Sequence, residues 1–272
     1  RLGNLPINNW RDARAPELAQ KIGAPAIQEQ IQIKRSGCRG CPIICSRVVE
    51  VKNGPYTTDG VVEGPEYETL VALGSLQRNN DLKSIAKANE LCNRLGLDTM
   101  SAGGIIAFAN ECWEKGLIDR KDTDGLELGF AKPDVILELI RRIAHGDGGF
   151  AKLLGMGVRE AARQVGKGAE EYAMHVKGLE PSYHDPRFSW GHALSYVTAN
   201  RGPCHLATLS HGFETVSTLP ELGFNEPHPG RQAAGKPELV YHLQNFMNLM
   251  DSLIGCKFTL FANTLHIQEH YL

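Results

Sequence analysis

The sequence predicts a mainly α-helical protein with one small β-hairpin. Apolar residues recur at helical spacing over most of the chain after residue 80, whereas strand-like runs are confined to residues 47–62. Segments rich in Gly, Pro, Asp and Asn interrupt the helical pattern at 119–133 and 219–236, as expected of surface loops. A chain of 272 residues is long enough for two domains. Helical periodicity ends near residues 176–181, so we predict domains at 1–178 and 179–272.

The first long helix is expected between Asp81, whose side chain can cap it, and Gly96, which can end it. A further helix should follow the acidic segment 63–68, because an apolar run begins there. The remaining expected helices are Ser101–Lys115, Pro133–Ala144, Gly157–Val165, Trp190–Thr198 and Pro237–Met250.

The hairpin is expected from the β-branched run Arg47–Val51, with Gly60–Val62 as its partner strand. Asn53-Gly54-Pro55 lies between the two runs and has the composition of a turn.

Charge and composition exclude some classes of partner. The net charge is −2 and Lys/Arg runs are absent, which argues against nucleic acid and anionic membranes. No apolar stretch approaches the roughly 18 residues that a bilayer-spanning helix needs. Seven cysteines without a secretory leader predict reduced thiols in the cytoplasm. The sequence begins at Arg1 rather than Met, so we expect it to be a piece of a longer chain.

The most specific motif is the cysteine loop, with Cys38, Cys41 and Cys45 spaced C-x₂-C-x₃-C and Cys256 as a remote fourth candidate. Three clustered thiolates and one distant thiolate are typical of a [4Fe–4S] cluster. A zinc site would usually have a second close Cys or His pair, and a disulfide framework suits a shorter secreted chain. The loop therefore favours electron transfer, with zinc and structural thiols as the alternatives.

Three carboxylates, Glu63, Glu66 and Glu68, fall within six residues before an apolar helix. They could simply complement the positive N-terminal end of that helix. Alternatively, one of them is buried and transfers protons beside a redox centre.

Two turns have a similar layout, with a polar residue, a glycine and then an Asp or Cys: Asn93–Asp98 and Asp251–Cys256. The first can be read as a helix C-cap followed by an N-cap. Both could also bind two similar ligands through backbone N–H groups and a carboxylate, which suits the amide and amine edges of a pterin. A further segment, Asn200–His205, brings together an arginine, a thiol and an imidazole. A histidine in such a turn is more often structural than catalytic.

Taken together and in order, these segments resemble the aldehyde ferredoxin oxidoreductase family. The resemblance extends from Gly3 to about Phe258. The motifs that carry it are the cysteine loop, Glu63-Gly-Pro-Glu-Tyr-Glu68, Asn93-Arg-Leu-Gly-Leu-Asp98, Asp185-Pro-Arg187, Asn200-Arg-Gly-Pro-Cys-His205 and Asp251-Ser-Leu-Ile-Gly-Cys256.

This resemblance implies an enzyme that oxidises aldehydes to carboxylic acids. Tungsten, or occasionally molybdenum, is held by two pterins, with Mg²⁺ bridging the pterin phosphates. A [4Fe–4S] cluster passes the electrons to ferredoxin. The chain would correspond to the two helical domains, numbered 2 and 3, that follow a mostly β N-terminal domain, which would be missing here.

The resemblance also assigns residues. Cys38, Cys41, Cys45 and Cys256 match the cluster ligands. The pterin-binding positions are Asn93, Gly96, Leu97 and Asp98 in one turn and Asp251, Gly255 and Cys256 in the other. The chain departs from the family pattern in two places. Asn93 stands where Asp is usual, and Leu-Ile-Gly-Cys replaces Ile-Gly-Leu-Cys, which displaces the glycine by one position.

For catalysis, the resemblance points to a glutamate of the Glu-Tyr-Glu segment and to a histidine near the metal. Glu66 and Glu68 are the leading carboxylates, with Glu63 as a third. His205 is preferred to His211 because it lies within the Asn200–His205 motif. The histidine would polarise the aldehyde oxygen by donating a hydrogen bond, and the glutamate would take a proton as water adds.

Two other functions stay open. The chain could be an iron–sulfur electron-transfer subunit without its own catalytic metal. It could also belong to a related tungstoenzyme, such as a benzoyl-CoA reductase-type subunit. The two pterin-like turns favour a cofactor-binding enzyme over a pure electron carrier.

Overall fold

The computed structural model describes residues 3–259, which form two compact units. The first unit contains residues 3–183, and the second begins at His184.

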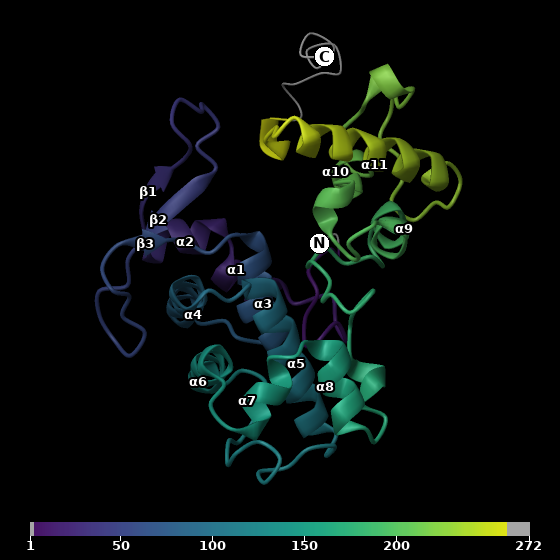
Figure 1. The fold of residues 1–272 in the computed structure, drawn as a ribbon. Coiled ribbons are helices and arrows are strands. Elements are labelled where there is room, and N and C mark those ends of the chain that lie inside the picture. Colours follow the sequence, from purple (N-terminus) through teal and green to yellow (C-terminus); the bar gives the residue numbers. More distant parts are fainter. Residues whose placement is uncertain (1–2, 260–272) are drawn as a thin grey trace. The chain divides into compact units, whose positions relative to one another are not determined.

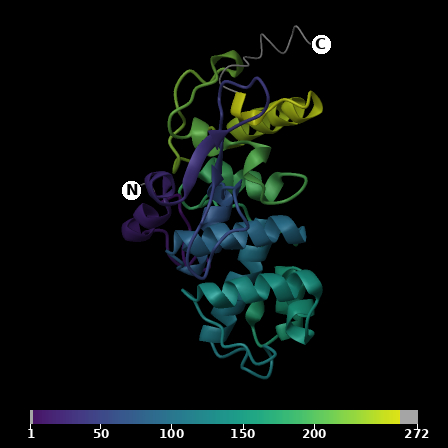
Figure 2. The same ribbon diagram turned by 90° about the vertical axis from the view of Figure 1, so that its left-hand side faces the viewer.

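The first unit is a helical body with a three-stranded antiparallel sheet, in the order β1-β2-β3 (Figure 1). The strands are β1 (Gln32–Ser36), β2 (Ser46–Val49) and β3 (Val62–Glu63). Arg35 lies opposite Arg47 and Ser36 opposite Ser46, so the cysteine loop connects β1 to β2. The β1–β2 hairpin projects beyond the helices of its own unit, as both views show (Figures 1 and 2).

The structure confirms the hairpin but corrects its connection. The second strand begins at Val62 rather than Gly60, and the connection covers residues 50–61 rather than a tight turn at Asn53-Gly54-Pro55. Thr58 holds this longer loop, because its N–H donates to the carbonyl of Val51 and its hydroxyl accepts the N–H of Val51.

The helices of the first unit pack around one apolar core that contains Leu73, Ile106, Phe108 and Leu139. The regular helices are α1 (Pro16–Ile22), α2 (Ala24–Gln30), α3 (Tyr67–Leu73), α4 (Leu82–Leu95), α5 (Thr99–Glu114), α6 (Pro133–His145), α7 (Gly149–Leu154) and α8 (Val158–Val165). Two short 3₁₀ turns, η1 (Ser75–Gln77) and η2 (Ala169–Tyr172), complete the unit.

Local signals fix the boundaries of α4 and α5. The Asp81 carboxylate accepts the N–H groups of Lys83 and Ser84, and Gly96 ends α4 in the left-handed conformation. The Asp98 carboxylate then caps α5 by accepting the N–H of Ser101.

α3 and α5 approach each other closely because Gly103 has no side chain. A Cβ atom at this position would lie 2.5 Å from the Cβ of Ala72. Gln77 strengthens the same junction, since its amide donates to the carbonyls of Ala72 at 3.0 Å and Gly103 at 2.7 Å. This packing joins the C-terminal turn of α3 to α5.

The second unit is built on α9 (Trp190–Thr198), α10 (Ser210–Phe213) and α11 (Lys236–Ser252). Three 3₁₀ turns, η3 (His205–Ala207), η4 (Pro220–Leu222) and η5 (Lys257–Thr259), lie in its loops. Its apolar core contains Phe213, Leu239, Leu243 and Met250.

A buried ion pair joins these three helices. The Lys236 ammonium at the start of α11 lies 2.5 Å from the Glu214 carboxylate, which directly follows α10. The same carboxylate accepts the N–H of Gly191 in α9 and the hydroxyl of Ser189. Removing one partner of such a pair would leave an uncompensated buried charge, so the pair fixes how the three helices meet.

The mainly α fold with a small sheet is therefore as predicted, and every helix expected after residue 80 is present with shifts of one or two residues at its ends. The elements α1, α2, β1, α7 and α10 were not predicted from the sequence. No helix within residues 3–259 has both the length and the apolar character needed to cross a bilayer.

Candidate functional site

The cysteine loop is closed by hydrogen bonds and a close backbone contact. The N–H of Cys41 donates to the carbonyl of Cys38 at 3.0 Å. The Arg35 guanidinium holds the far side of the loop by donating to the carbonyls of Ile43 at 3.3 Å and Ile44 at 2.8 Å. Gly37 permits this closure, because a Cβ there would lie 2.8 Å from the Cα of Ile44.

The three thiols of this loop are free. Cys38 and Cys45 are exposed and Cys41 is partly exposed. Three thiols on one short loop are a donor set that fits an iron–sulfur cluster. Cys92 and Cys112 differ from them, because burial raises the pKa of each thiol to about 12 and suits them to packing.

The first two carboxylates of the acidic segment lie near the sheet. Glu63 accepts the hydroxyl of Ser46 at 2.8 Å, and Glu66 lies 3.5 Å from the guanidinium of Arg47. Burial raises the pKa of Glu66, while the charge of Arg47 lowers it and that of Glu63 raises it. Both residues are exposed, and both interact with groups of β2.

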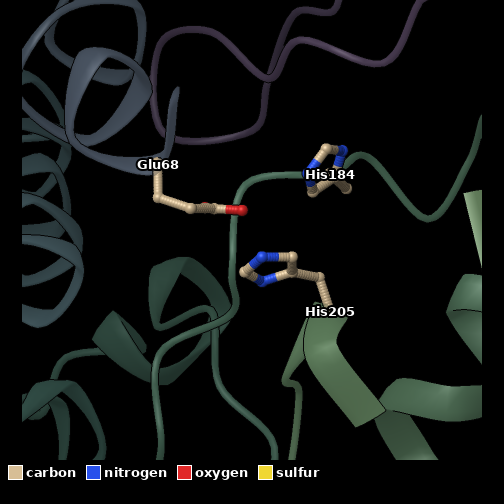
Figure 3. A group of neighbouring side chains, drawn as sticks. All are labelled: Glu68, His184 and His205. Carbon is tan, nitrogen blue, oxygen red and sulfur yellow. The ribbon is translucent and has the colours of Figure 1, made fainter. Parts of the chain in front are cut away.

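Glu68 is different because its carboxyl group is largely buried. It lies in the first turn of α3, and Figure 3 shows its side chain extending from that helix. Its Oε2 accepts the N–H of Tyr183 at 2.6 Å. Burial, with a smaller contribution from the charge of Asp98, raises the pKa of Glu68 to about 7 against the opposing effect of this hydrogen bond. Of the three candidate carboxylates, Glu68 is the one suited to exchange a proton near neutral pH.

Hydrogen bonds of the segment Glu180–Tyr183 hold in place the Tyr183 N–H that donates to Glu68. The Tyr183 carbonyl accepts the hydroxyl of Tyr67 at 3.1 Å, and the Tyr183 hydroxyl donates to the carbonyl of Met100 at 2.7 Å. The carboxylate of Glu180 accepts the N–H of Val158 at 2.8 Å and the hydroxyl of Ser101 at 2.9 Å. The backbone N–H that Glu68 accepts is thus anchored to α3, α5 and α8.

The first predicted pterin-binding turn has the helix-cap structure described for Gly96 and Asp98. The N–H of Leu97 donates to the carbonyl of Cys92 at 2.9 Å. Asn93, Gly96 and Asp98 are all exposed, and a Cβ at Gly96 would have no neighbour within 4 Å. The open backbone and the adjacent carboxylate fit a flat polar ligand, while the cap alone would explain the local structure.

In the second unit, the predicted histidine motif follows α9. Before that helix, Asp185 and Arg187 form an ion pair with a shortest distance of 2.6 Å. His205 is the first residue of η3 (Figure 3). Burial, with smaller contributions from the charges of His211, Lys257 and Arg201, lowers the pKa of His205 to about 4. His205 is therefore a neutral imidazole at neutral pH, with one N–H to donate.

The second unit also contains a cluster of four histidines, His184, His192, His205 and His211, which the sequence analysis did not recognise. The rings of His184 and His211 stack with centroids 4.1 Å apart. His205 lies 5.2 Å and His192 5.6 Å from the ring of His184. Burial lowers the pKa of His184 to about 2, and it lowers that of His192 well below its usual value. The cluster is thus uncharged at neutral pH.

The second predicted pterin-binding turn ends α11. The Lys257 ammonium donates to the carboxylate of Asp251 at 2.9 Å and to the carbonyl of Leu206 at 2.8 Å. It therefore joins this turn to the residue after His205. The left-handed position of the turn is Ile254, with φ of 57°, which is where the family pattern has glycine. Gly255 does not take this conformation, and its N–H closes the turn on the carbonyl of Met250.

A pocket of about 340 Å³ lies between the histidine motif and this turn. Its lining residues are Ala199, Asn200, Arg201, Cys204, Leu206, Ala207, Gln244, Asn248, Asp251 and Lys257. Cationic, amide and carboxylate groups in one pocket can bind a polar heterocycle with an anionic substituent. The sequence offers a signal that was missed, because Gln244, Asn248 and Asp251 are spaced to share one face of α11.

The structure thus places the predicted residues in two groups. The first unit contains Cys38, Cys41 and Cys45, the carboxylates Glu66 and Glu68, and the turn Asn93–Asp98. The second contains His205, Asp251, Gly255 and Cys256, of which His205 and Asp251 lie in segments joined by Lys257. The cluster ligand role of Cys256, which is exposed, stays a prediction.

Comparisons with known proteins agree with the motifs. A family model described as aldehyde ferredoxin oxidoreductase, domains 2 and 3, matches residues 1–271. A tungsten-containing aldehyde ferredoxin oxidoreductase of Pyrococcus furiosus is 35% identical over 261 residues, covering 96% of this chain and 41% of the relative. An aliphatic sulfonate oxidoreductase WOR-like subunit of the same organism is 27% identical over 210 residues, 75% of this chain and 33% of the relative.

Among solved structures, the active site complex BamBC of benzoyl coenzyme A reductase has a similar fold. Its TM-score is 0.60 at 23% identity, covering 76% of this chain and 31% of the other. This likeness concerns the fold alone. The chain spans about two fifths of the length of the tungsten-containing relative, 41%.

The buried His192 predicts a stability change with pH. In the unfolded chain it binds a proton near its ordinary pKa of 6.5, whereas in the folded protein it does so only at much lower pH. The free energy of unfolding should therefore fall as the pH drops below that value, by up to about 1.4 kcal/mol per pH unit for this residue. The Nδ1 atom of His192 lies 2.9 Å from the Ser210 hydroxyl, and an asparagine side chain can keep this hydrogen bond. In His192→Asn, urea unfolding at pH 7.5, 6.5 and 5.5 should therefore show a smaller loss of stability. His145→Asn, at an exposed position of α6, is the control. The prediction is contradicted if the free energy of unfolding falls equally with pH in wild type and His192→Asn.

The left-handed Ile254 predicts a stabilising substitution. A β-branched residue is disfavoured in this conformation, and the side chain is 93% exposed, so little packing is lost on its removal. Ile254→Gly should raise the free energy of unfolding by about 1 kcal/mol in urea titrations. Leu253→Gly is the matched control, because Leu253 has φ of −83° and glycine should weaken the chain there. The prediction is wrong if both glycine variants lose stability equally.

Proposed function

The chain belongs to the aldehyde ferredoxin oxidoreductase family, a family of oxidoreductases, and from that premise we propose that it forms the helical part of a tungstoenzyme. The proposed reaction converts an aldehyde and water to a carboxylic acid, two protons and two electrons. The electrons leave one at a time through a [4Fe–4S] cluster to ferredoxin or another iron–sulfur acceptor. An N-terminal domain of the same protein would complete the site.

The second unit's pocket supports the cofactor assignment. Asp251 and Asn248 offer acceptors and donors for the edge of a pterin, and Arg201 and Lys257 offer cations for its phosphate. Asn93, Gly96, Leu97 and Asp98 would bind the other pterin at the first turn, where the backbone is open. A Mg²⁺ ion between the phosphates is part of the proposal. The bound tungstopterin would supply the two-electron chemistry that protein side chains lack.

The thiols of the cysteine loop support the cluster. Cys38, Cys41 and Cys45 are free on one turn, and Cys256 is the proposed fourth ligand. Exposed reduced thiols of this kind fit a reducing cytoplasm.

One observation carries the catalytic part of the proposal: the largely buried carboxyl of Glu68, whose pKa is raised to about 7. At neutral pH a substantial fraction is ionised and can accept the proton of a water molecule that adds to the aldehyde carbon. Oε1 would receive the proton, because Oε2 already accepts the N–H of Tyr183. Glu66 interacts with Arg47 and is less suited to this role.

His205 would act on the aldehyde oxygen. Its imidazole is neutral, since burial lowers its pKa to about 4, so its N–H donates a hydrogen bond without transferring a full charge. Such a donor stabilises negative charge as it develops on the carbonyl oxygen. His205 would thus orient the substrate while Glu68 moves the proton.

Elemental analysis tests this function directly. We expect the full-length protein, purified without oxygen, to contain about one tungsten, two pterins and four irons per chain. It should then reduce a viologen dye when an aldehyde is added. Iron without tungsten, molybdenum or pterin would instead indicate an electron-transfer subunit and overturn the catalytic proposal.

Substitution of the carboxyl groups tests the proposed base. Glu68→Gln should lower kcat by at least about a hundredfold, because the amide cannot accept the proton. In the wild type, kcat should rise with pH through about 7 as Glu68 loses its proton, and this rise should be absent from the residual activity of the variant. Glu66→Gln is the matched control and should retain both the rate and the pH profile. Loss of activity in Glu66→Gln with Glu68→Gln active would reverse the assignment.

A further inference from the structure

The cysteine loop lies in a segment of unusual local charge. Residues 31–49 contain four cationic side chains, Lys34, Arg35, Arg39 and Arg47, and no carboxylate, although Asp and Glu outnumber Lys and Arg in the whole chain, 31 to 29. We call these four residues the cationic collar. Along the β1–β2 hairpin, two of these residues precede the three free thiols, one lies among them and one follows them.

Two members of the collar have structural roles. Arg35 closes the cysteine loop through the carbonyls of Ile43 and Ile44. Arg47, which lies opposite Arg35 across the two strands, interacts with Glu66 at 3.5 Å. The positions of these two guanidinium groups are therefore explained by contacts within the first unit.

Lys34 and Arg39 are not explained in this way. Both are exposed, and neither forms an ion pair or side-chain hydrogen bond within residues 3–259. Lys34 lies in β1 three residues before Gly37, and Arg39 lies between the first two thiols. Two unpaired cations on a hairpin that projects beyond its helices create a local positive potential beside the thiols (Figures 1 and 2).

We propose that Lys34 and Arg39 form a docking surface for an acidic electron-carrier protein. This inference rests on the proposed function, because it assumes a cluster on the three thiols. The partner is a small iron–sulfur protein with carboxylates around its own centre. One electron passes from the reduced cluster to the oxidised centre of the partner in each encounter, and no bond is made or broken. Two encounters remove the two electrons released from one aldehyde.

Charge complementarity commits this surface to an acidic occupant. A positive patch speeds the approach of a negative partner and rejects a positive one, with effects of about 10- to 1,000-fold on the association rate at low salt. The competing role for Lys34 and Arg39 is to offset the negative charge of the cluster, which would change its reduction potential but not the affinity for a partner.

Charge reversal distinguishes the two roles. The test variant is Lys34→Glu/Arg39→Glu, and the matched control is Arg141→Glu/Lys152→Glu on α6 and α7, which lie away from the sheet within the first unit (Figure 1). The probe is an oxidised acidic [4Fe–4S] ferredoxin without aldehyde present, so that binding is measured independently of turnover. A basic cytochrome c serves as the opposite-charge probe.

We expect the test variant to bind the ferredoxin about tenfold or more weakly than wild type at low ionic strength. The difference should shrink at about 0.5 M salt, where charges are screened over a few ångströms. The control variant should bind like wild type, and the cytochrome should bind the test variant more tightly. Unchanged ferredoxin affinity, with or without a shifted cluster potential, would overturn the proposal.

Dye reduction separates failure of this inference from failure of the proposed function. A small viologen does not need the docking surface, so the test variant should reduce it with aldehyde as fast as wild type. If the wild type itself reduces no dye, the proposed function fails. If dye reduction is normal and ferredoxin binding is insensitive to the reversal, only the docking surface is wrong.

Discussion

The hydrogen bond from the Tyr183 N–H to Glu68 is the interaction on which the candidate chemistry of the first unit depends. It fixes one carboxylate oxygen at 2.6 Å while the rest of the side chain extends from α3. The N–H of Tyr183 is held in position because the rest of this residue is also hydrogen-bonded. Its carbonyl accepts the hydroxyl of Tyr67 in α3, and its hydroxyl donates to the carbonyl of Met100 in α5. The ring of Trp10 also lies 5.8 Å from that of Tyr183. The hydrogen bonds of Tyr183 to Tyr67 and Met100 therefore hold the donor that meets the carboxyl of Glu68.

The balance between burial and the neighbouring donors and charges sets the pKa of a buried carboxyl group. The carboxylate of Glu90 is also enclosed, yet its pKa is lowered, because Lys87, Arg94 and the N–H of Asp59 outweigh the effect of burial. Glu68 has the same side chain, but there burial outweighs the hydrogen bond from the Tyr183 N–H and raises the pKa to about 7. Glu90 therefore stays ionised and structural, whereas Glu68 can gain and lose a proton near neutral pH. A sequence cannot reveal this difference, since both residues lie beside apolar helical positions.

Local signals made much of the fold predictable. Asp81, Gly96 and Asp98 act through contacts within four residues, so the boundaries of α4 and α5 could be read from the sequence. The elements that were missed depend on distant partners: β1 has weak alternation and is defined by pairing with β2, and α7 has only six residues between glycines. The histidine cluster was missed for the same reason. His184, His192 and His211 have no regular spacing, and His192 of α9 meets His211 of α10 only in the folded chain, with ring centroids 5.0 Å apart.

The electrostatics of the cysteine hairpin show why local charge matters more than net charge here. With a net charge of −2, the whole chain offers an acidic partner no attraction at long range. Salt screens exposed charges beyond about 10 Å at 0.1 M, so a partner that reaches the hairpin responds mainly to the charges on it. Arg35 and Arg47 are held by neighbouring carbonyl and carboxylate groups, which keeps the loop in shape. Lys34 and Arg39 have no such contacts among the described residues and face solvent. Arg35 and Arg47 thus maintain the structure of the hairpin, while Lys34 and Arg39 can interact with a partner protein.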